Sequence, residues 1–154
     1  MSLDGFDKEI LRELEQDARI SYRKISEKIN ISVGTVHNRI ARLKEHGIIQ
    51  GYLLSLNEQK LDYKLKVVIS LSIKGTKLHD TLKKISKYRQ VTNVYSISGN
   101  ASAILICRFR NLDEFRSFSN QLHKIEAINQ LETNIIIDVI KEDPHHLLSS
   151  EPVE

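Results

Sequence analysis

ISYRKISEKINISVGTVHNRIARLKEH, residues 20–46, is the stretch that decides the fold of the first part of the chain. It predicts two short helices joined by a polar turn, in which Ser32 is suited to cap the second helix. Apolar side chains recur at the spacing of a buried helical stripe, at Ile25 and Ile29 and then at Val36, Ile40 and Leu43. With that stripe turned inward, the flanks and outer face of the second helix carry Thr35, His37, Asn38, Arg39, Arg42 and Lys44. Asparagine and arginine bond base edges and basic residues bind phosphates, so the stretch is typical of a helix-turn-helix that reads DNA.

The charge of this part of the chain supports that interpretation. Residues 19–46 hold seven basic and two acidic residues, a local charge of +5, although the whole chain carries only +3. The preceding residues 4–17 hold six acidic and two basic residues, a local charge of −4. A basic helix is often no more than a solvated surface, but here the turn, the cap and the inward stripe coincide with it. The combination favours a surface that binds a polyanion.

Length and composition place the chain among small cytoplasmic proteins. It has 154 residues, of which 40% are hydrophobic, and no apolar run approaches the roughly 20 residues that span a bilayer, so no membrane partner is expected. Cys107, the single cysteine, lies in an apolar run and is expected to be a buried core residue. No phosphate-binding loop, dinucleotide fingerprint or nucleophile elbow is present, so we expect no cofactor and no catalytic residue. The pair His145–His146 is interpreted as part of a solvated acidic tail, and no metal site is expected.

Beyond residue 64 the hydrophobic period changes from helical to alternating. Residues 65–73 alternate as a strand, and a helix follows around residues 78–85. Two strands at 91–98 and 101–109, a helix around 115–125 and a last strand at 133–140 complete the order βαββαβ. This order is that of the ferredoxin-like split motif. We therefore predict an α+β chain with a helix-turn-helix, winged-helix-like head at 1–54, a hinge at 55–64, a ferredoxin-like domain at 65–143 and an acidic tail at 144–154.

The predicted sheet has apolar side chains on both faces. On the strand at 101–109, Ile104 and Ile106 lie on one face, and Ala103, Leu105 and Cys107 lie on the other. Two helices can cover only one of these faces, and a second copy of the chain is the simplest cover for the other. A homodimer would also place two recognition helices about 34 Å apart, as reading a palindromic site requires.

Several local motifs make the chain similar to one family. They are the runs Leu3–Leu11, Asp17–Ser21 and Gly47–Tyr52, together with Arg39, Ile40 and Leu43. With the order of its domains, the chain resembles the leucine-responsive/asparagine-regulator (Lrp/AsnC) family over residues 3–143. The resemblance implies a sequence-specific transcriptional regulator that binds double-stranded DNA and dimerises through its C-terminal domain, with tetramers or octamers as further assemblies. It also implies autoregulation, and an amino acid as small-molecule effector bound between dimers.

The resemblance assigns DNA contacts to particular positions. Ser32, Thr35, His37, Asn38, Arg39 and Arg42 match the DNA-reading helix, and Tyr22 and Arg23 are placed to contact phosphate. We expect Asn38 and His37 to contact bases. Arg39 and Arg42 are expected either to hold phosphate or to anchor the helix. For Arg39 the alternative is a brace to an acidic residue of the first helix.

The effector site departs from the family pattern. Family members have Gly-Asp followed closely by a second acidic residue, whereas this chain reads Gly99-Asn100-Ala101-Ser102. Thr133 still matches a polar family position. Gly99, Asn100, Ser102 and Thr133 are therefore the candidate effector residues, with a plain hairpin that binds nothing as the alternative.

Two other classes of function remain open from the sequence. A sirohaem-decarboxylase-like enzyme pairs a similar head with a chemistry-bearing domain, but it would be expected to lose the basic helix. An architectural protein that coats DNA with little sequence preference would keep that helix. A specific regulator should prefer its site by about 10³-fold or more over other DNA, and this ratio separates the two DNA-binding alternatives.

Overall fold

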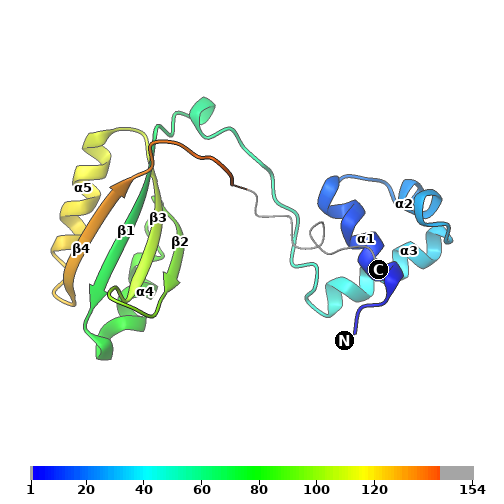
Figure 1. Ribbon diagram of the computed structural model, residues 1–154, viewed down its shortest axis with the longest axis horizontal. Coiled ribbons are helices and arrows are strands. Elements are labelled where there is room, and N and C mark those ends of the chain that lie inside the picture. Colours follow the sequence, from blue (N-terminus) through cyan, green and yellow to red (C-terminus); the bar gives the residue numbers. More distant parts are fainter. Residues whose placement is uncertain (1, 143–154) are drawn as a thin grey trace. The chain divides into compact units, whose positions relative to one another are not determined.

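The computed structural model describes residues 2–142, which form two compact units (Figure 1). The first unit runs to Ser55 and the second runs from Leu56 to Ile140. The predicted tail at 144–154, including His145–His146, lies outside the described residues. None of the helices in the described part of the chain is long and apolar enough to cross a membrane.

The first unit consists of three helices around one apolar core. The helices are α1 (Gly5–Gln16), α2 (Tyr22–Ile29) and α3 (Val33–Glu45). Their shared core is formed by Ile10, Leu11, Leu14, Ile25, Val36, Ile40 and Leu43. The predicted stripe of α3 is confirmed, because its three apolar residues are at most 1% exposed. Burying each such side chain contributes about 1.5–3 kcal/mol.

Local chain geometry fixes the ends of these helices. Asn30 adopts a left-handed conformation (φ 55°) that ends α2, and Ser32 caps α3. After α3, Gly47 has a φ of +69°, and the amide of Ile48 donates to the carbonyl of Leu43 at 2.9 Å. This is the Schellman arrangement, in which glycine avoids the strain that a side chain would meet. The end of the helix at Gly47 agrees with the prediction.

The second unit is a four-stranded antiparallel sheet with two helices, as the split motif predicts. The strands are β1 (Leu65–Ile73), β2 (Val91–Ser96), β3 (Ala103–Phe109) and β4 (Ile128–Ile135), in the order β2-β3-β1-β4. The helices are α4 (Leu78–Ile85) and α5 (Leu112–His123). Both pack on the same face (Figure 1), where the residues of β1 and β3 that point toward them are fully or nearly fully buried. The opposite face, defined here as the open face, is covered by no helix of the described chain.

The structure corrects the position of the last strand. It runs from Ile128 to Ile135 and not over 133–140. Ile135 pairs with Val67, near the start of β1, so the partner strand ends two residues further on. The apolar run that suggested a later strand is left exposed, with Ile137 91% and Ile140 95% accessible. Apolar, β-branched sequence indicated a strand there, but a strand needs a neighbour to pair with.

The segment predicted as a hinge also has structure of its own. Within residues 55–64, a short 3₁₀-helix spans Gln59–Leu61, and the amide of Lys64 donates to the carbonyl of Phe109 at 3.0 Å. Most of this segment is therefore part of the second unit. The preceding residues 50–57 form neither helix nor strand.

Candidate nucleic-acid interface and effector site

The first turn of α3 is organised by two hydroxyl side chains that the sequence assigned to DNA. Ser32 Oγ accepts a hydrogen bond from the amide of Thr35 at 3.0 Å and lies 2.8 Å from Thr35 Oγ1. An N-cap of this kind typically contributes about 1 kcal/mol to helix stability. Ser32 and Thr35 therefore shape the start of the recognition helix, whatever else they contact.

The outer face of α3 presents His37 and Asn38. Both side chains are exposed, and they lie away from the buried stripe. Within residues 2–142, the side-chain amide of Asn38 makes no hydrogen bond, so both its donor and its acceptor are available. The ring of His37 packs edge-on against Tyr22 of α2, with 5.9 Å between the ring centroids. Tyr22, at the start of α2, and His37, on the outer face of α3, therefore lie side by side.

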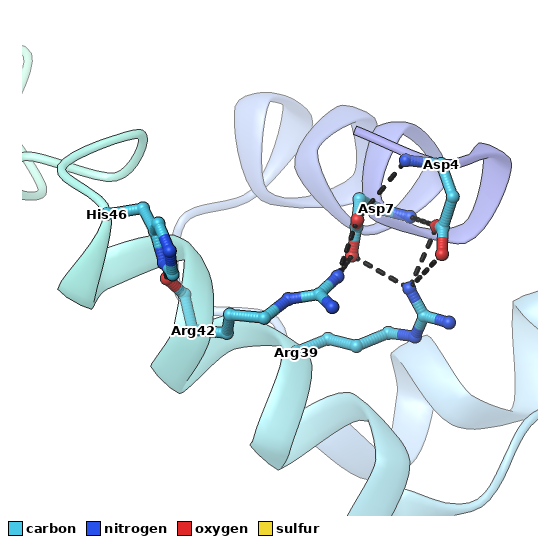
Figure 2. Close-up of polar contacts among 5 residues, drawn as sticks. All are labelled: Asp4, Asp7, Arg39, Arg42 and His46. Carbon is cyan, nitrogen blue, oxygen red and sulfur yellow. Dashed lines mark hydrogen bonds and ion pairs between the residues drawn. The ribbon is translucent and has the colours of Figure 1, made fainter. Parts of the chain in front are cut away.

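Arg39 and Arg42 point instead toward α1 (Figure 2). Arg39 Nη1 donates to both carboxylate oxygens of Asp4, at 2.8 and 2.6 Å, and to Asp7 Oδ1 at 2.9 Å. Arg42 Nη2 donates to Asp7 at 2.8 and 3.0 Å. Asp7 is fully buried, and these two arginines compensate the charge of its carboxylate, which a buried carboxylate requires. The geometry favours the anchoring alternative for both residues.

The electrostatics of this cluster follow from those contacts. The hydrogen bond from Arg39, with that from the backbone of Asp7, lowers the pKa of Asp4 below its usual value. The same bonds to Asp4 and then Asp7 raise the pKa of Arg39. Two charges that the sequence counted toward a DNA-binding surface are therefore neutralised within the head.

Other cations of the head are exposed to solvent. Arg23 pairs with Glu27 at 3.1 Å, but the two side chains are 83% and 61% exposed, and such pairs contribute little. Lys24 beside it has no carboxylate partner within the described residues. Lys44 lies 5.3 Å above the ring of Tyr52. The DNA contacts assigned from the sequence include neither Lys24 nor Lys44, although both residues contribute to the local charge of +5.

In the second unit, Ser102 serves the sheet. Its Oγ accepts from the amide of Ile73 at 3.1 Å and donates to the carbonyl of Ile73 at 3.3 Å. Its own amide donates to the carbonyl of Leu71 at 2.7 Å. Gly99, with a φ of +128°, forms the turn that precedes it. These contacts hold the β2–β3 turn against the end of β1.

The four candidate effector residues do not all lie on one face of the sheet. Thr133 pairs with Ile69, whose side chain is buried under the helices, so Thr133 shares that face. Asn100 instead lines a cavity of about 80 Å³ with Ser70, Ser72, Ala101, Gln130 and Glu132. Ser70 pairs with Glu132 and Ser72 with Gln130, which places the cavity on the open face. The sequence did not indicate that Glu132 lies beside Asn100, because the last strand was expected to begin at residue 133.

Comparisons with known proteins agree with this architecture. Residues 3–50 match the model of winged helix-turn-helix DNA-binding domains, and residues 66–145 match that of the Lrp/AsnC ligand binding domain. The chain is 34% identical over 143 residues to an uncharacterized HTH-type transcriptional regulator of Pyrococcus furiosus, covering 93% of this chain and 97% of that one. It is 30% identical over 140 residues to the HTH-type transcriptional regulator LrpA of Pyrococcus horikoshii, covering 90% and 99%.

Solved structures show the same fold. AsnC of E. coli superimposes with a TM-score of 0.86 at 25% identity, covering 92% of this chain and 97% of the other. The regulator NMB0573 of Neisseria meningitidis, solved as a complex with L-Met, superimposes with a TM-score of 0.88 at 21% identity, covering 94% and 96%. The chain belongs to the Lrp/AsnC family, as a helix-turn-helix transcriptional regulator with a DNA-binding head and a ligand-binding domain.

Proposed function

We propose that this regulator reads its DNA site through the outer face of α3, with Asn38 and His37 at the base edges. The observation that carries the proposal is the exposed Asn38 amide, which has no hydrogen-bond partner within residues 2–142. An asparagine amide presents a donor and an acceptor side by side, which matches the major-groove edge of adenine. Losing one good bidentate pair of this kind costs about 1–3 kcal/mol of discrimination.

Phosphate contacts are proposed for side chains outside the Asp4–Asp7 cluster. Tyr22, Arg23, Lys24 and Lys44 are the candidates, whereas Arg39 and Arg42 anchor α3 to α1. The support is the pairing of both arginines with carboxylates at 2.6–3.0 Å. If Arg42 held a phosphate, replacing it with alanine would make the dependence of log K on log salt less steep. The magnitude of the slope would decrease by about 0.9. We expect that decrease for Lys24→Ala and not for Arg42→Ala.

We further propose that the chain forms a homodimer through the open face. Its middle carries half-buried Val68, Ile104 and Ile106 beside Tyr95, which is 51% exposed. Covering these side chains with a second copy would remove them from water, and a two-fold partner supplies the same patch. Ile106→Glu should shift the chain toward monomer in sedimentation equilibrium, whereas Lys83→Glu, on the exposed side of α4, should not. Further assembly into tetramers or octamers stays a prediction.

The test of DNA reading is equilibrium binding to the region upstream of the chain's own gene, against a scrambled DNA at several salt concentrations. Wild type, Asn38→Ala and the control Asn129→Ala, an exposed asparagine of β4, are compared. We expect wild type and Asn129→Ala to bind the upstream DNA tightly and to discriminate against the scrambled DNA. Asn38→Ala should lose this discrimination. Equal binding to both DNAs with a steep salt slope would support an architectural role instead. No binding to either DNA would contradict the proposal. It would favour the alternative of a sirohaem-decarboxylase-like enzyme, for which a bound tetrapyrrole would be the evidence.

A second proposed function is effector binding in the cavity beside Asn100. Glu132 supplies a carboxylate there, beside Asn100, which occupies one of the two turn positions that are acidic in the family. A carboxylate with nearby hydroxyl and amide groups suits the ammonium group of an amino acid. Calorimetric titration with a panel of amino acids should find one whose binding weakens at least about tenfold in Glu132→Gln. The control Glu126→Gln should bind as wild type does, and equal loss in both variants, or no binding by wild type, would contradict this site.

A further inference from the structure

The segment that connects the two units makes contacts with the head at its start and folds against the sheet domain at its end. On the side of the head, Lys44 lies over the ring of Tyr52 at 5.3 Å. On the side of the sheet, Asn57 begins a folded segment, since its carbonyl accepts from Leu61 and its side chain accepts from the amide of Lys60 at 2.9 Å. Only residues 53–56 lie between these contacts. Three of these four are leucines with exposed fractions of 77%, 82% and 61%.

An ion pair with β3 is one of the contacts that attach the folded segment to the sheet. Both carboxylate oxygens of Glu58 lie 2.7 Å from Arg108 Nε on β3. The Arg108 side chain is only 11% exposed, and its Nη1 also donates to Thr92 Oγ1 at 3.5 Å. A partly desolvated, charge-assisted contact of this kind is stronger than an exposed ion pair. Of the two ion pairs in this segment, Glu58–Arg108 and Lys64–Asp62, it is therefore the stronger.

Neighbouring contacts depend on the same placement. The amide of Tyr63 donates to the carbonyl of Glu58 at 2.9 Å, and the guanidinium of Arg110 lies 5.8 Å from the Tyr63 ring centroid. The nearby pair of Lys64 with Asp62, at 3.0 Å, is exposed by 69% and 64%. Screening by solvent makes that second pair weak, so it offers a matched control.

We infer that the Glu58–Arg108 pair sets the free length of the tether, and thereby the range of half-site spacings that the dimer tolerates on DNA. This rests on the proposed function, because it requires two heads that read two half-sites. Loss of the pair would extend the free tether from residues 53–56 to residues 53–63, from four residues to eleven. The effective concentration of a tethered module falls roughly as the −3/2 power of tether length. Binding at the preferred spacing should then weaken roughly four- to fivefold.

The experiment uses the full chain as wild type, Glu58→Gln and the control Lys64→Gln. DNA sites are first selected from a random pool by wild type, and variants of the selected site are then made with zero to ten base pairs inserted at the centre. Affinity is measured across the series. Separately, amide exchange is measured at Leu61 and Tyr63 without DNA, which reports on the segment whether or not DNA is read.

Glu58→Gln should accelerate exchange at these amides about tenfold and weaken binding at the preferred spacing. It should also reduce the penalty for insertions of half a helical turn, whereas Lys64→Gln should match wild type in both measurements. Unchanged exchange in Glu58→Gln would overturn the role of the ion pair. Faster exchange with an unchanged spacing profile would overturn its effect on DNA. If wild type selects no DNA, or a site without a spacing preference, it is the proposed reading of two half-sites that fails, and the spacing inference falls with it.

Discussion

Replacing Asp7 with alanine should destabilise the DNA-binding head by about 3 kcal/mol. Asp7 is fully buried and receives three hydrogen bonds from Arg39 and Arg42, at 2.8–3.0 Å, and one from the amide of Asp4 at 3.3 Å. Hydrogen bonds to a charged group contribute about 1.5–3 kcal/mol each. The sum must be discounted, because the arginines are 21% and 46% exposed and can recover water once Asp7 is gone. The lower end of the range for breaking a buried pair, about 3 kcal/mol, is therefore expected.

Urea titration of the full chain, followed by NMR signals of α1–α3, measures this effect separately from the sheet domain. Asp7→Asn keeps an acceptor but not the charge, and it should cost about 1–2 kcal/mol. Glu27→Gln removes the exposed partner of Arg23 and should change stability by less than about 0.5 kcal/mol. A double-mutant cycle of Asp7→Ala with Arg42→Ala should show a coupling of about 1 kcal/mol or more. A loss below about 1 kcal/mol in Asp7→Ala, with no coupling, would refute the anchoring role.

Three further outcomes are expected. Because Arg39 lowers the pKa of Asp4, the stabilising contribution of the Asp4 carboxylate is present above its unfolded value near 3.8 and is lost as pH falls through the lower folded value. NMR titration should find the pKa of Asp4 higher in Arg39→Gln, and an unchanged value would contradict the pairing. Burial raises the pKa of Cys107 to about 12, so alkylation at pH 8 should be slow in the native chain and fast in urea. Ser102→Ala should destabilise the sheet domain by about 1 kcal/mol, seen in urea titration, and leave effector affinity unchanged if Glu132 holds the effector.

Much of the fold was predictable because the hydrophobic pattern states it locally. The stripe of α3, its cap at Ser32 and its end at Gly47 follow from side chains a few residues apart, and the structure confirms them. The order of strands and helices in the second unit followed from the same kind of pattern. The last strand was misplaced because the apolar run at 135–140 looks like a strand, whereas pairing with β1 ends it at Ile135. Pairing is a relation between distant segments, and no local pattern contains it.

The sequence alone thus determined the kind of protein: a helix-turn-helix head, a split βαββαβ domain and a basic recognition helix. Only the tertiary structure decided which groups the individual side chains contact. Whether Arg39 holds phosphate or Asp4 depends on which helix packs beside α3, and whether Thr133 or Glu132 lines the cavity depends on strand register. A register shift of one residue moves every side chain to the other face of the sheet. Composition and spacing are properties of one segment, whereas a site is a property of segments that packing brings together.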